Sequence, residues 1–195
     1  MSGDQSRRHI KSEGTKRYVF LNFLKKHLKK IKNMEIRIRP AENADMEAVW
    51  QMWKVIMEQK IYYPYADNYP RAEIEKSWIN LKNYVFVATQ GEEIVGAYIF
   101  KANQPGYGGH IANAAYMVKN DKRGQRIGHQ LCEHSIEAAK MAGFRAMQFN
   151  LVASTNKSAV KTWLDCGFEI IGTVPEGFYH FDQGYVDAYI FYRKL

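Results

Sequence analysis

The sequence predicts a mixed α/β domain in which helices flank a central sheet. From Met34 onward, segments with strand periodicity alternate with segments of helical periodicity, in the order strand, helix, helix and then strands interleaved with helices. A glycine-bearing turn at residues 123–128 joins a strand to a helix, as is typical of α/β units. The 195-residue chain is 46% hydrophobic with 14 glycines, which fits a globular protein of one domain.

The first third of this domain predicts one strand and two helices. Residues 35–39 alternate between apolar and charged side chains, as a half-buried strand does. Asn43 or Asp45 can cap the first helix, and Pro70 suits the first turn of the second. The loop between the helices is rich in tyrosine. The apolar face of the first helix is formed by Val49, Met52, Trp53 and Ile56.

The rest of the chain predicts more strands and two further helices. A Gln-Gly-Glu turn at residues 90–92 joins two strands as a hairpin. Gly143 ends the third helix. The strands are expected at residues 84–89, 93–100, 111–118, 145–152, 168–174 and 188–192, and the helices at residues 124–141 and 156–165.

The turn Arg123-Gly124-Gln125-Arg126-Ile127-Gly128 can hold a pyrophosphate, because its backbone N–H groups and the positive end of the following helix point the same way. Its spacing fits neither the phosphate loop G-x-x-x-x-G-K-[ST] nor the dinucleotide fingerprint. It resembles the acyl-CoA turn of the GCN5-related N-acetyltransferases (GNAT), [QR]-x-x-G-x-[GA]. Arg126 stands where the middle glycine is usual, and we expect it to be helical, which requires no positive φ.

A second segment, residues 156–168, is similar to the family's motif N-x-x-[AS]-x-x-x-[YW]-x-x-x-G-F, with Asn156, Ala159, Gly167 and Phe168 in register. The resemblance covers residues 34–195. It implies a central, mixed, mostly antiparallel twisted sheet that is splayed between its fourth and fifth strands and flanked by helices. It also implies an N-acetyltransferase that uses acetyl-CoA as acyl donor.

The turn supplies most of the predicted cofactor site. Its backbone N–H groups would bind the pyrophosphate, and its two arginines would add charge-assisted hydrogen bonds. The resemblance implies that Met117 and Val118 run beside the pantetheine and bond it through their backbone, where an N–H also polarises the thioester carbonyl. Asn156 is a helix cap, a pantetheine contact, or both. The predicted cofactor-binding residues are Met117, Val118, Arg123, Gly124, Gln125, Arg126, Ile127, Gly128 and Asn156.

Two asparagines are the candidate catalytic residues. Trp163 replaces the tyrosine acid usual in the second motif, and the strand at residues 112–118 lacks the glutamate base that the family often carries there. Asn113 and Asn150 are the polar groups at this place, and buried amides need partners. A bound ligand or a structural bond to loop backbone would each satisfy them. The same positions resemble those of fungal acetyltransferases that act on proline analogues such as azetidine-2-carboxylate.

The acceptor is expected to be a small-molecule amine, such as an amino or imino acid. A neutral amide cannot take up a proton, so His110, His180 and Tyr63 are the candidate relays. Aromatic loops at residues 62–69 and 175–181 would wall a small acceptor site. The alternatives are a protein acetyltransferase acting on lysine or an N-terminus, and a non-catalytic acyl-CoA-binding module.

The charge of the chain lies in its first segment. Residues 1–33 carry ten Lys/Arg and two Asp/Glu, whereas residues 34–195 carry eighteen of each, so the net charge of +8 belongs to the extension. We expect this extension to be disordered and then helical at residues 18–32, with membrane-surface binding, RNA docking or no role as alternatives. The neutral domain predicts no nucleic-acid partner.

Composition also bounds location, metals and assembly. No apolar run approaches the ~20 residues that cross a bilayer, and the polar first residues fit no secretory signal, so a cytoplasmic protein is expected. In such a protein Cys132 and Cys166 are expected to be reduced thiols. The six histidines show no metal-ligand spacing, and no metal site is expected. A homodimer is left open.

Overall fold

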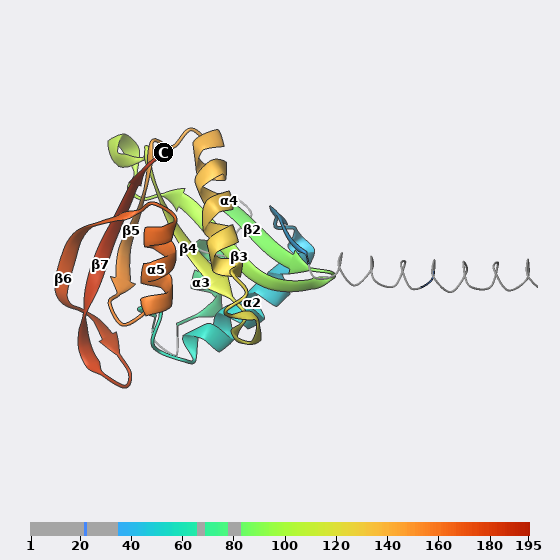
Figure 1. Ribbon diagram of the computed structural model, residues 1–195, viewed down its shortest axis with the longest axis horizontal. Coiled ribbons are helices and arrows are strands. Elements are labelled where there is room, and N and C mark those ends of the chain that lie inside the picture. The colour runs from blue at the N-terminus through green and yellow to red at the C-terminus, as the bar shows by residue number, and fades with distance from the viewer. Residues whose placement is uncertain (1–21, 23–34, 66–68, 78–82) are drawn as a thin grey trace, which may run out of the picture. The chain divides into compact units, whose positions relative to one another are not determined.

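The computed structural model describes residues 22, 35–65, 69–77 and 83–195. Residues 37–195 form one compact unit, and the predicted extension lies, apart from Asn22, outside the described residues. In the described part, strands form a seven-stranded sheet with the order β1-β2-β3-β4-β5-β7-β6 (Figure 1). The mixed α/β fold expected from the sequence is therefore confirmed.

The elements follow the predicted order with small shifts at most ends, and the last two strands are longer than predicted. The helices are α2 (Met46–Met57), α3 (Arg71–Ser77), α4 (Ile127–Met141) and α5 (Lys157–Asp165). The strands are β1 (Ile36–Pro40), β2 (Tyr84–Gln90), β3 (Glu93–Ala102), β4 (Ile111–Val118), β5 (Ala146–Ala153), β6 (Glu169–His180) and β7 (Gly184–Lys194).

The sheet is antiparallel at β2–β3, β3–β4, β5–β7 and β6–β7, and parallel at β4–β5. The parallel pairing joins only Ile111 to Ala146 and Ala112 to Met147. Beyond these two pairs β4 and β5 diverge, which is the predicted splay. The polar backbone groups on the facing edges of the two strands are left without a strand partner there, and such groups need another partner when buried.

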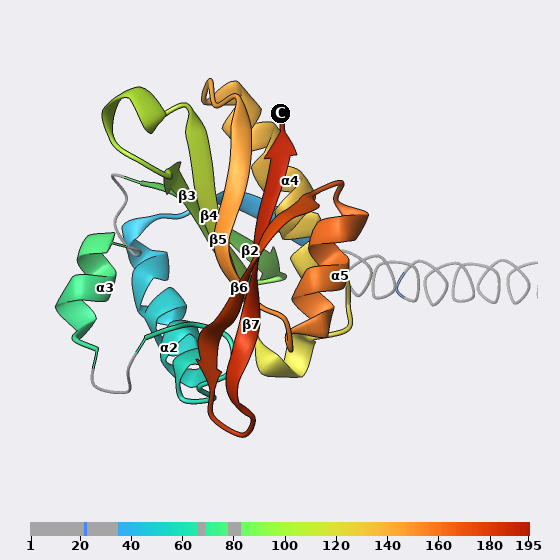
Figure 2. The same ribbon diagram turned by 90° about the vertical axis from the view of Figure 1, so that its left-hand side faces the viewer.

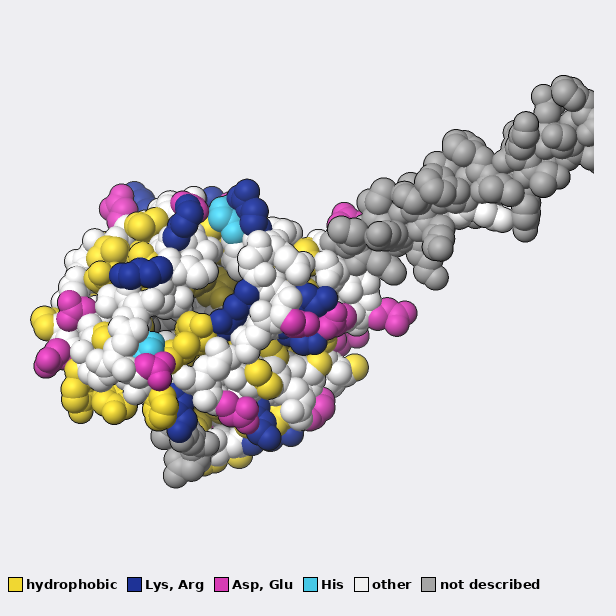
Figure 3. Space-filling view, turned by 60° about the horizontal axis from the view of Figure 1, so that its bottom comes forward, with side chains coloured by type: hydrophobic (Ala, Val, Ile, Leu, Met, Phe, Trp, Pro, Cys, Tyr) yellow, Lys and Arg dark blue, Asp and Glu magenta, His cyan; other side chains and the backbone are white. Residues whose placement is uncertain are grey.

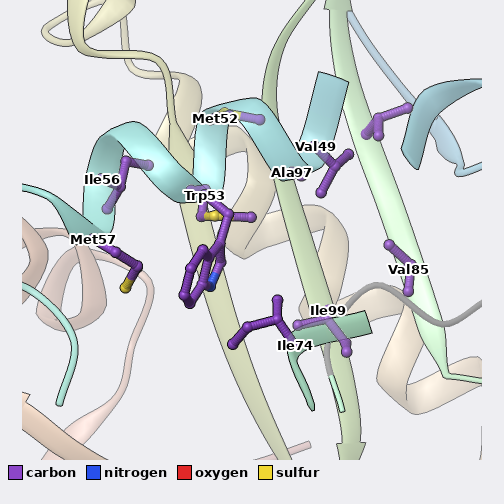
Figure 4. Packing of buried hydrophobic residues seen from close by; sticks show 11 residues of the cluster. Val49, Met52, Trp53, Ile56, Met57, Ile74, Val85, Ala97 and Ile99 are labelled. Atoms are coloured by element: carbon purple, nitrogen blue, oxygen red, sulfur yellow. The ribbon is translucent and has the colours of Figure 1, made fainter. Parts of the chain in front are cut away.

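Helices cover both faces of the sheet. Figure 2 shows α2 and α3 on one side and α4 and α5 on the other. The apolar face of α2 packs on the sheet through Val49, Met52, Trp53 and Ile56, as predicted, together with Val85, Ala97 and Ile99 of the strands (Figure 4). Full burial of one such side chain contributes about 1.5–3 kcal/mol, so this packing fixes α2 and the loop that follows it.

Gly96 allows α4 to lie close to β3. A Cβ at this position would be 3.0 Å from both Leu131 Cδ1 and the Met117 carbonyl oxygen. The side chains that α4 buries include Ile127, Leu131 and Ile136. A larger residue at position 96 would push α4 away from the sheet and displace the turn that precedes the helix.

Two local predictions are wrong. Helix α4 begins at Ile127 rather than residue 124, because Gly124 (φ 78°) and Arg126 (φ 60°) are left-handed and Arg126 is therefore not helical. The predicted loop at residues 175–181 is mostly strand β6. Pro175 is tolerated there because β6 is an edge strand, and a register shift between Val174 and Phe178 absorbs the irregularity.

Candidate active site

A cavity of about 820 Å³ runs through the splay between β4 and β5. It is bordered by the turn at residues 123–128, by one face of α5, and by the tyrosine loop that follows α2. Figure 3 shows a hollow on this side of the domain with Lys and Arg side chains around it. The volume lies within the range of small-molecule and cofactor sites, and the cavity joins the predicted cofactor and acceptor residues.

The backbone of β4 alternates between its neighbour β3 and the cavity. Lys119 N–H donates to the Val95 carbonyl at 2.9 Å, and the Ile111 carbonyl accepts from Asn103 N–H at 2.8 Å, so odd-numbered residues face β3. Even-numbered residues then present their backbone groups to the splay. Val118 is placed there as expected, but Tyr116 lies beside it instead of Met117, whose side chain lines the cavity.

Tyr63 holds β4 from the acceptor side. Its hydroxyl donates to the Tyr116 carbonyl at 2.6 Å across 53 residues of sequence. Burial raises the pKa of the Tyr63 hydroxyl well above its usual value, so the group stays protonated and remains a donor. The bond uses the Tyr116 carbonyl only. The Tyr116 N–H lies on the same edge of β4, is directed into the splay and is not engaged by Tyr63. Tyr63 therefore holds the strand as a hydrogen-bond donor.

The turn before α4 lies against the cavity as predicted. Gly124, Arg126, Ile127 and Gly128 line it, whereas Gln125 is exposed and does not. A Cβ at Gly128 would meet only Val118 Cγ2, at 3.9 Å. Packing within the protein therefore does not require glycine here, and the open space beside the helix start fits a pyrophosphate held by backbone N–H groups.

Arg123 connects the turn to the tyrosine loop. Its Nη1 donates to the Tyr62 hydroxyl at 2.6 Å, and its guanidinium lies 4.6 Å from the centre of the Tyr62 ring. The other N–H groups of the guanidinium can still bind an anion, because arginine has five donors. The contact therefore orients Arg123 at the mouth of the cavity.

Helix α5 contributes a cap and an aromatic wall. Asn156 Oδ1 accepts from Ala159 N–H at 3.2 Å, which confirms the capping role, and Asn156 also lines the cavity. Trp163 is buried, with ring centres 4.6 Å from Tyr116 and 5.0 Å from Phe149. An indole in this packing supplies no acid, so it serves as a wall of the cavity.

An amide cluster occupies the closed end of the splay. Asn103 Oδ1 accepts from Asn113 Nδ2 at 3.2 Å and from Asn150 Nδ2 at 2.7 Å, and Asn150 Oδ1 accepts from Gln148 Nε2 at 3.0 Å. The two predicted asparagines are thus brought together by a third, Asn103, which the sequence reasoning missed. Lys101 lies directly opposite Asn113 in the sheet and lines the same end of the cavity.

The amide cluster faces the tyrosine loop. Asn113 shares its face of β4 with Met117, which packs against α2, and Tyr62, Tyr63 and Tyr65 after α2 line the same cavity. Tyr116, whose ring meets Trp163 of α5, points to the other face. The splay therefore connects a compartment next to α5 with an acceptor compartment next to α2.

The candidate relays other than Tyr63 lie outside the cavity. His110 Nδ1 is 3.1 Å from the Tyr107 carbonyl in an exposed loop, and His180 Nδ1 accepts from Asp182 N–H at 3.2 Å at the turn after β6. The segment 175–181 does not line the cavity either. Among the described lining residues the carboxylate is Asp165 of α5, so the acceptor compartment holds no carboxylate base.

Within the described part of the chain, no group of three or more His, Cys, Asp and Glu side chains could hold a metal ion. Cys132 and Cys166 are buried free thiols. The hydrogen bond to Cys166, together with burial, raises the pKa of Cys132 far above its usual value. No helix in the described residues is long and apolar enough to cross a membrane.

Comparison with known proteins identifies the family. The acetyltransferase (GNAT) family profile matches residues 46–168. The N-acetyltransferase aca1 of Schizosaccharomyces pombe is 34% identical over 99 residues, which is 50% of this chain and 47% of that protein, so the match spans about half of the relative.

Solved structures of acetyltransferases share the fold of this chain. A GCN5-related N-acetyltransferase from Kribbella flavida is 35% identical, with a TM-score of 0.79 over 82% of this chain and 98% of that one. The acetyltransferase yncA from Salmonella typhimurium, solved with acetyl-CoA, shares the fold at 17% identity, with a TM-score of 0.74 over 83% of this chain and 94% of that one. The chain belongs to the acetyltransferase (GNAT) family, whose acyl donor is acetyl-CoA.

Proposed function

We propose that this chain transfers the acetyl group of acetyl-CoA to the amine of a small molecule that also carries a carboxylate, such as an amino or imino acid. The observation that carries the proposal is the acceptor compartment, in which Asn113, Asn150 and Asn103 form one hydrogen-bonded cluster beside Lys101. Lys101 forms no ion pair with any described residue. An ammonium group and amide N–H donors are the groups that bind a carboxylate.

The size of the compartment supports a small acceptor. The rings of Tyr63 and Tyr65 stack with centres 6.3 Å apart, and both line the cavity next to Ile56 of α2. These side chains give the acceptor end an apolar wall. A peptide would need an extended open groove in the same place, and the tyrosine loop occupies it.

The chain's own groups fit each step of acetyl transfer. When bound, acetyl-CoA supplies the acetyl group as a thioester. The turn before α4 would bind the pyrophosphate, and the backbone N–H groups of Tyr116 and Val118 would donate to the pantetheine and to the thioester carbonyl. Asn113 and Asn150 hold the acceptor so that its amine faces this edge of β4.

Proton transfer is left largely to solvent. The hydroxyls of Tyr63 and Tyr116, two residues that line the cavity, have their pKa raised by burial and remain protonated. The amine therefore arrives neutral or loses its proton to water. Indole at Trp163 gives no acid, and a thiolate is a tolerable leaving group near neutral pH.

Thiol release from acetyl-CoA tests the proposal. Each amino or imino acid should be compared with its own carboxamide, which keeps the amine and removes the carboxylate charge. We expect the acid to be the better acceptor by about tenfold in kcat/KM. The Lys101→Gln variant should lose this preference, while Lys54→Gln, on the exposed side of α2, should keep it. Equal use of acid and carboxamide by the wild type, or faster transfer to lysine-containing peptides, would overturn the proposal.

A further inference from the structure

One face of α5 borders the outer mouth of the cavity. Ser158, Lys161, Thr162 and Asp165 all line it, and their spacing of three to four residues puts them on one side of the helix. Across the mouth lie Arg126 of the turn and His129 in the first turn of α4. These side chains lie beside the backbone cradle at residues 124–128 that fits the pyrophosphate, and Arg126 contributes its backbone to that cradle and its side chain to the mouth.

The guanidinium of Arg126 is a positive charge at this mouth that has no ion-pair partner among the described residues. Lys161 Nζ is 2.7 Å from Asp165 Oδ2, and His129 Nδ1 is 3.2 Å from Glu133 Oε2, so those groups are paired on their own helices. Arg126 is exposed, and its guanidinium forms no hydrogen bond or ion pair with any residue of the described chain. The hydrogen bond from Lys161 and the charges of His129 and Arg126 lower the pKa of Asp165, so each of these three side chains acts electrostatically on Asp165.

The left-handed backbone conformation at Arg126 costs folding free energy. Its φ of 60° lies in the left-handed region that glycine occupies without strain, and a non-glycine residue there typically costs about 1–3 kcal/mol. No hydrogen bond or ion pair of the guanidinium within the described residues offsets that cost. A bound anion at the mouth would do so.

We infer that Arg126, assisted by Lys161 and the Ser158 hydroxyl, binds the 3′-phosphate of coenzyme A, so that the enzyme distinguishes acetyl-CoA from its 3′-dephospho analogue. The inference rests on the assigned acyl donor and adds a subsite to it. A guanidinium beside an ammonium and a hydroxyl is suited to a phosphate monoester. Asp165 opposes the anion, and Lys161 must turn from Asp165 toward the phosphate to take part.

Direct binding tests this without any acetyl acceptor. Calorimetry would compare CoA with 3′-dephospho-CoA on the full chain, and we expect CoA to bind about tenfold more tightly. Arg126→Gly should weaken CoA by about that factor and leave 3′-dephospho-CoA unchanged. This substitution puts glycine at a left-handed position, so it relieves strain and the variant is expected to fold at least as stably.

Two further variants sharpen the test. Asp165→Asn removes the opposing carboxylate and frees Lys161, so the preference for CoA should rise by about threefold. Lys140 lies in the last turn of α4, so the control variant Lys140→Gln should leave the affinities for CoA and 3′-dephospho-CoA unchanged. Equal weakening of CoA and 3′-dephospho-CoA by Arg126→Gly would place the guanidinium on the pyrophosphate and overturn the inference. Equal affinities in the wild type would overturn it too, whereas binding of neither compound would also refute the assigned acyl donor.

Discussion

The guanidinium of Arg123 lies over the ring of Tyr62, 4.6 Å from its centre, and donates to the Tyr62 hydroxyl at 2.6 Å. The two residues are 61 positions apart and belong to different compartments of the site. Arg123 begins the turn that fits the pyrophosphate, and Tyr62 begins the tyrosine loop that closes the acceptor end. Their contact links donor binding to the position of the acceptor wall.

Tyr62→Phe should weaken acetyl-CoA binding by about three- to tenfold, because it removes the hydroxyl that orients Arg123 while keeping the ring. Calorimetric Kd values for acetyl-CoA would measure this. Tyr107→Phe is the matched control, since Tyr107 is fully exposed in the β3–β4 loop. An unchanged Kd in Tyr62→Phe would show that Arg123 does not depend on this contact.

Asn103→Ala should raise the KM for the acceptor about tenfold and leave the Kd for acetyl-CoA within twofold. The substitution removes the oxygen that accepts from both Asn113 and Asn150, so both amides lose their common partner. Steady-state kinetics with a fixed amino acid acceptor would measure the effect. Asn43→Ala, an exposed position before α2, serves as control. A rise in the Kd for acetyl-CoA instead would assign the cluster to the cofactor side.

The pH dependence should follow the acceptor and not the enzyme. Because Tyr63 and Tyr116 stay protonated and the acceptor compartment holds no carboxylate among its described residues, log kcat/KM should rise with unit slope up to the pKa of the acceptor's own amine. Profiles with two acceptors of different amine pKa would place the break at two different pH values. A break near neutral pH that is the same for both would reveal a base on the enzyme.

Stability should fall in mild acid through His134. The Tyr98 hydroxyl, which stays protonated because burial raises its pKa, is hydrogen-bonded to His134 Nδ1 at 2.7 Å. Burial lowers the pKa of His134, so the unfolded chain takes up a proton first as pH falls below about 6.5. The free energy of unfolding is therefore unaffected above that pH and decreases below it, until the folded pKa is reached.

Urea unfolding at pH 7.5 and pH 5.5 would measure this loss in the wild type and in His134→Gln. Other histidines titrate in both proteins, so the difference between the two isolates His134. The wild type should lose more stability than the variant between the two pH values. A larger loss in the variant would contradict the assigned direction of the pKa shift.

The fold and the cofactor turn could be predicted because they depend on local signals. Strand and helix periodicity, the glycine turn and the Asn156 cap each act over a few residues, and the structure contains all of them. The helical conformation predicted for Arg126 is wrong, because its φ of 60° lies in the left-handed region. No local preference of arginine would suggest that conformation.

The acceptor site could be predicted only in part. Asn113 and Asn150 were found as polar residues on adjacent strands, but Asn103 lies beyond the expected end of its strand. Its role depends on the β3–β4 register that sets Lys101 opposite Asn113. The sequence feature that could have revealed Asn103 is its position ten residues before Asn113, on the preceding arm of the β3–β4 hairpin. The same tertiary dependence explains why segment 175–181, aromatic but part of an edge strand, does not reach the cavity.

The most direct test of the account is thiol release from acetyl-CoA in the presence of amino acids, imino acids, their carboxamides and lysine-containing peptides, with mass spectrometry of the products. The account predicts N-acetylated amino or imino acid as the main product, a preference for the free carboxylate, and its loss in Lys101→Gln. Acetylated peptide as the main product, or binding of acetyl-CoA without stimulated thiol release by any of these acceptors, would contradict it.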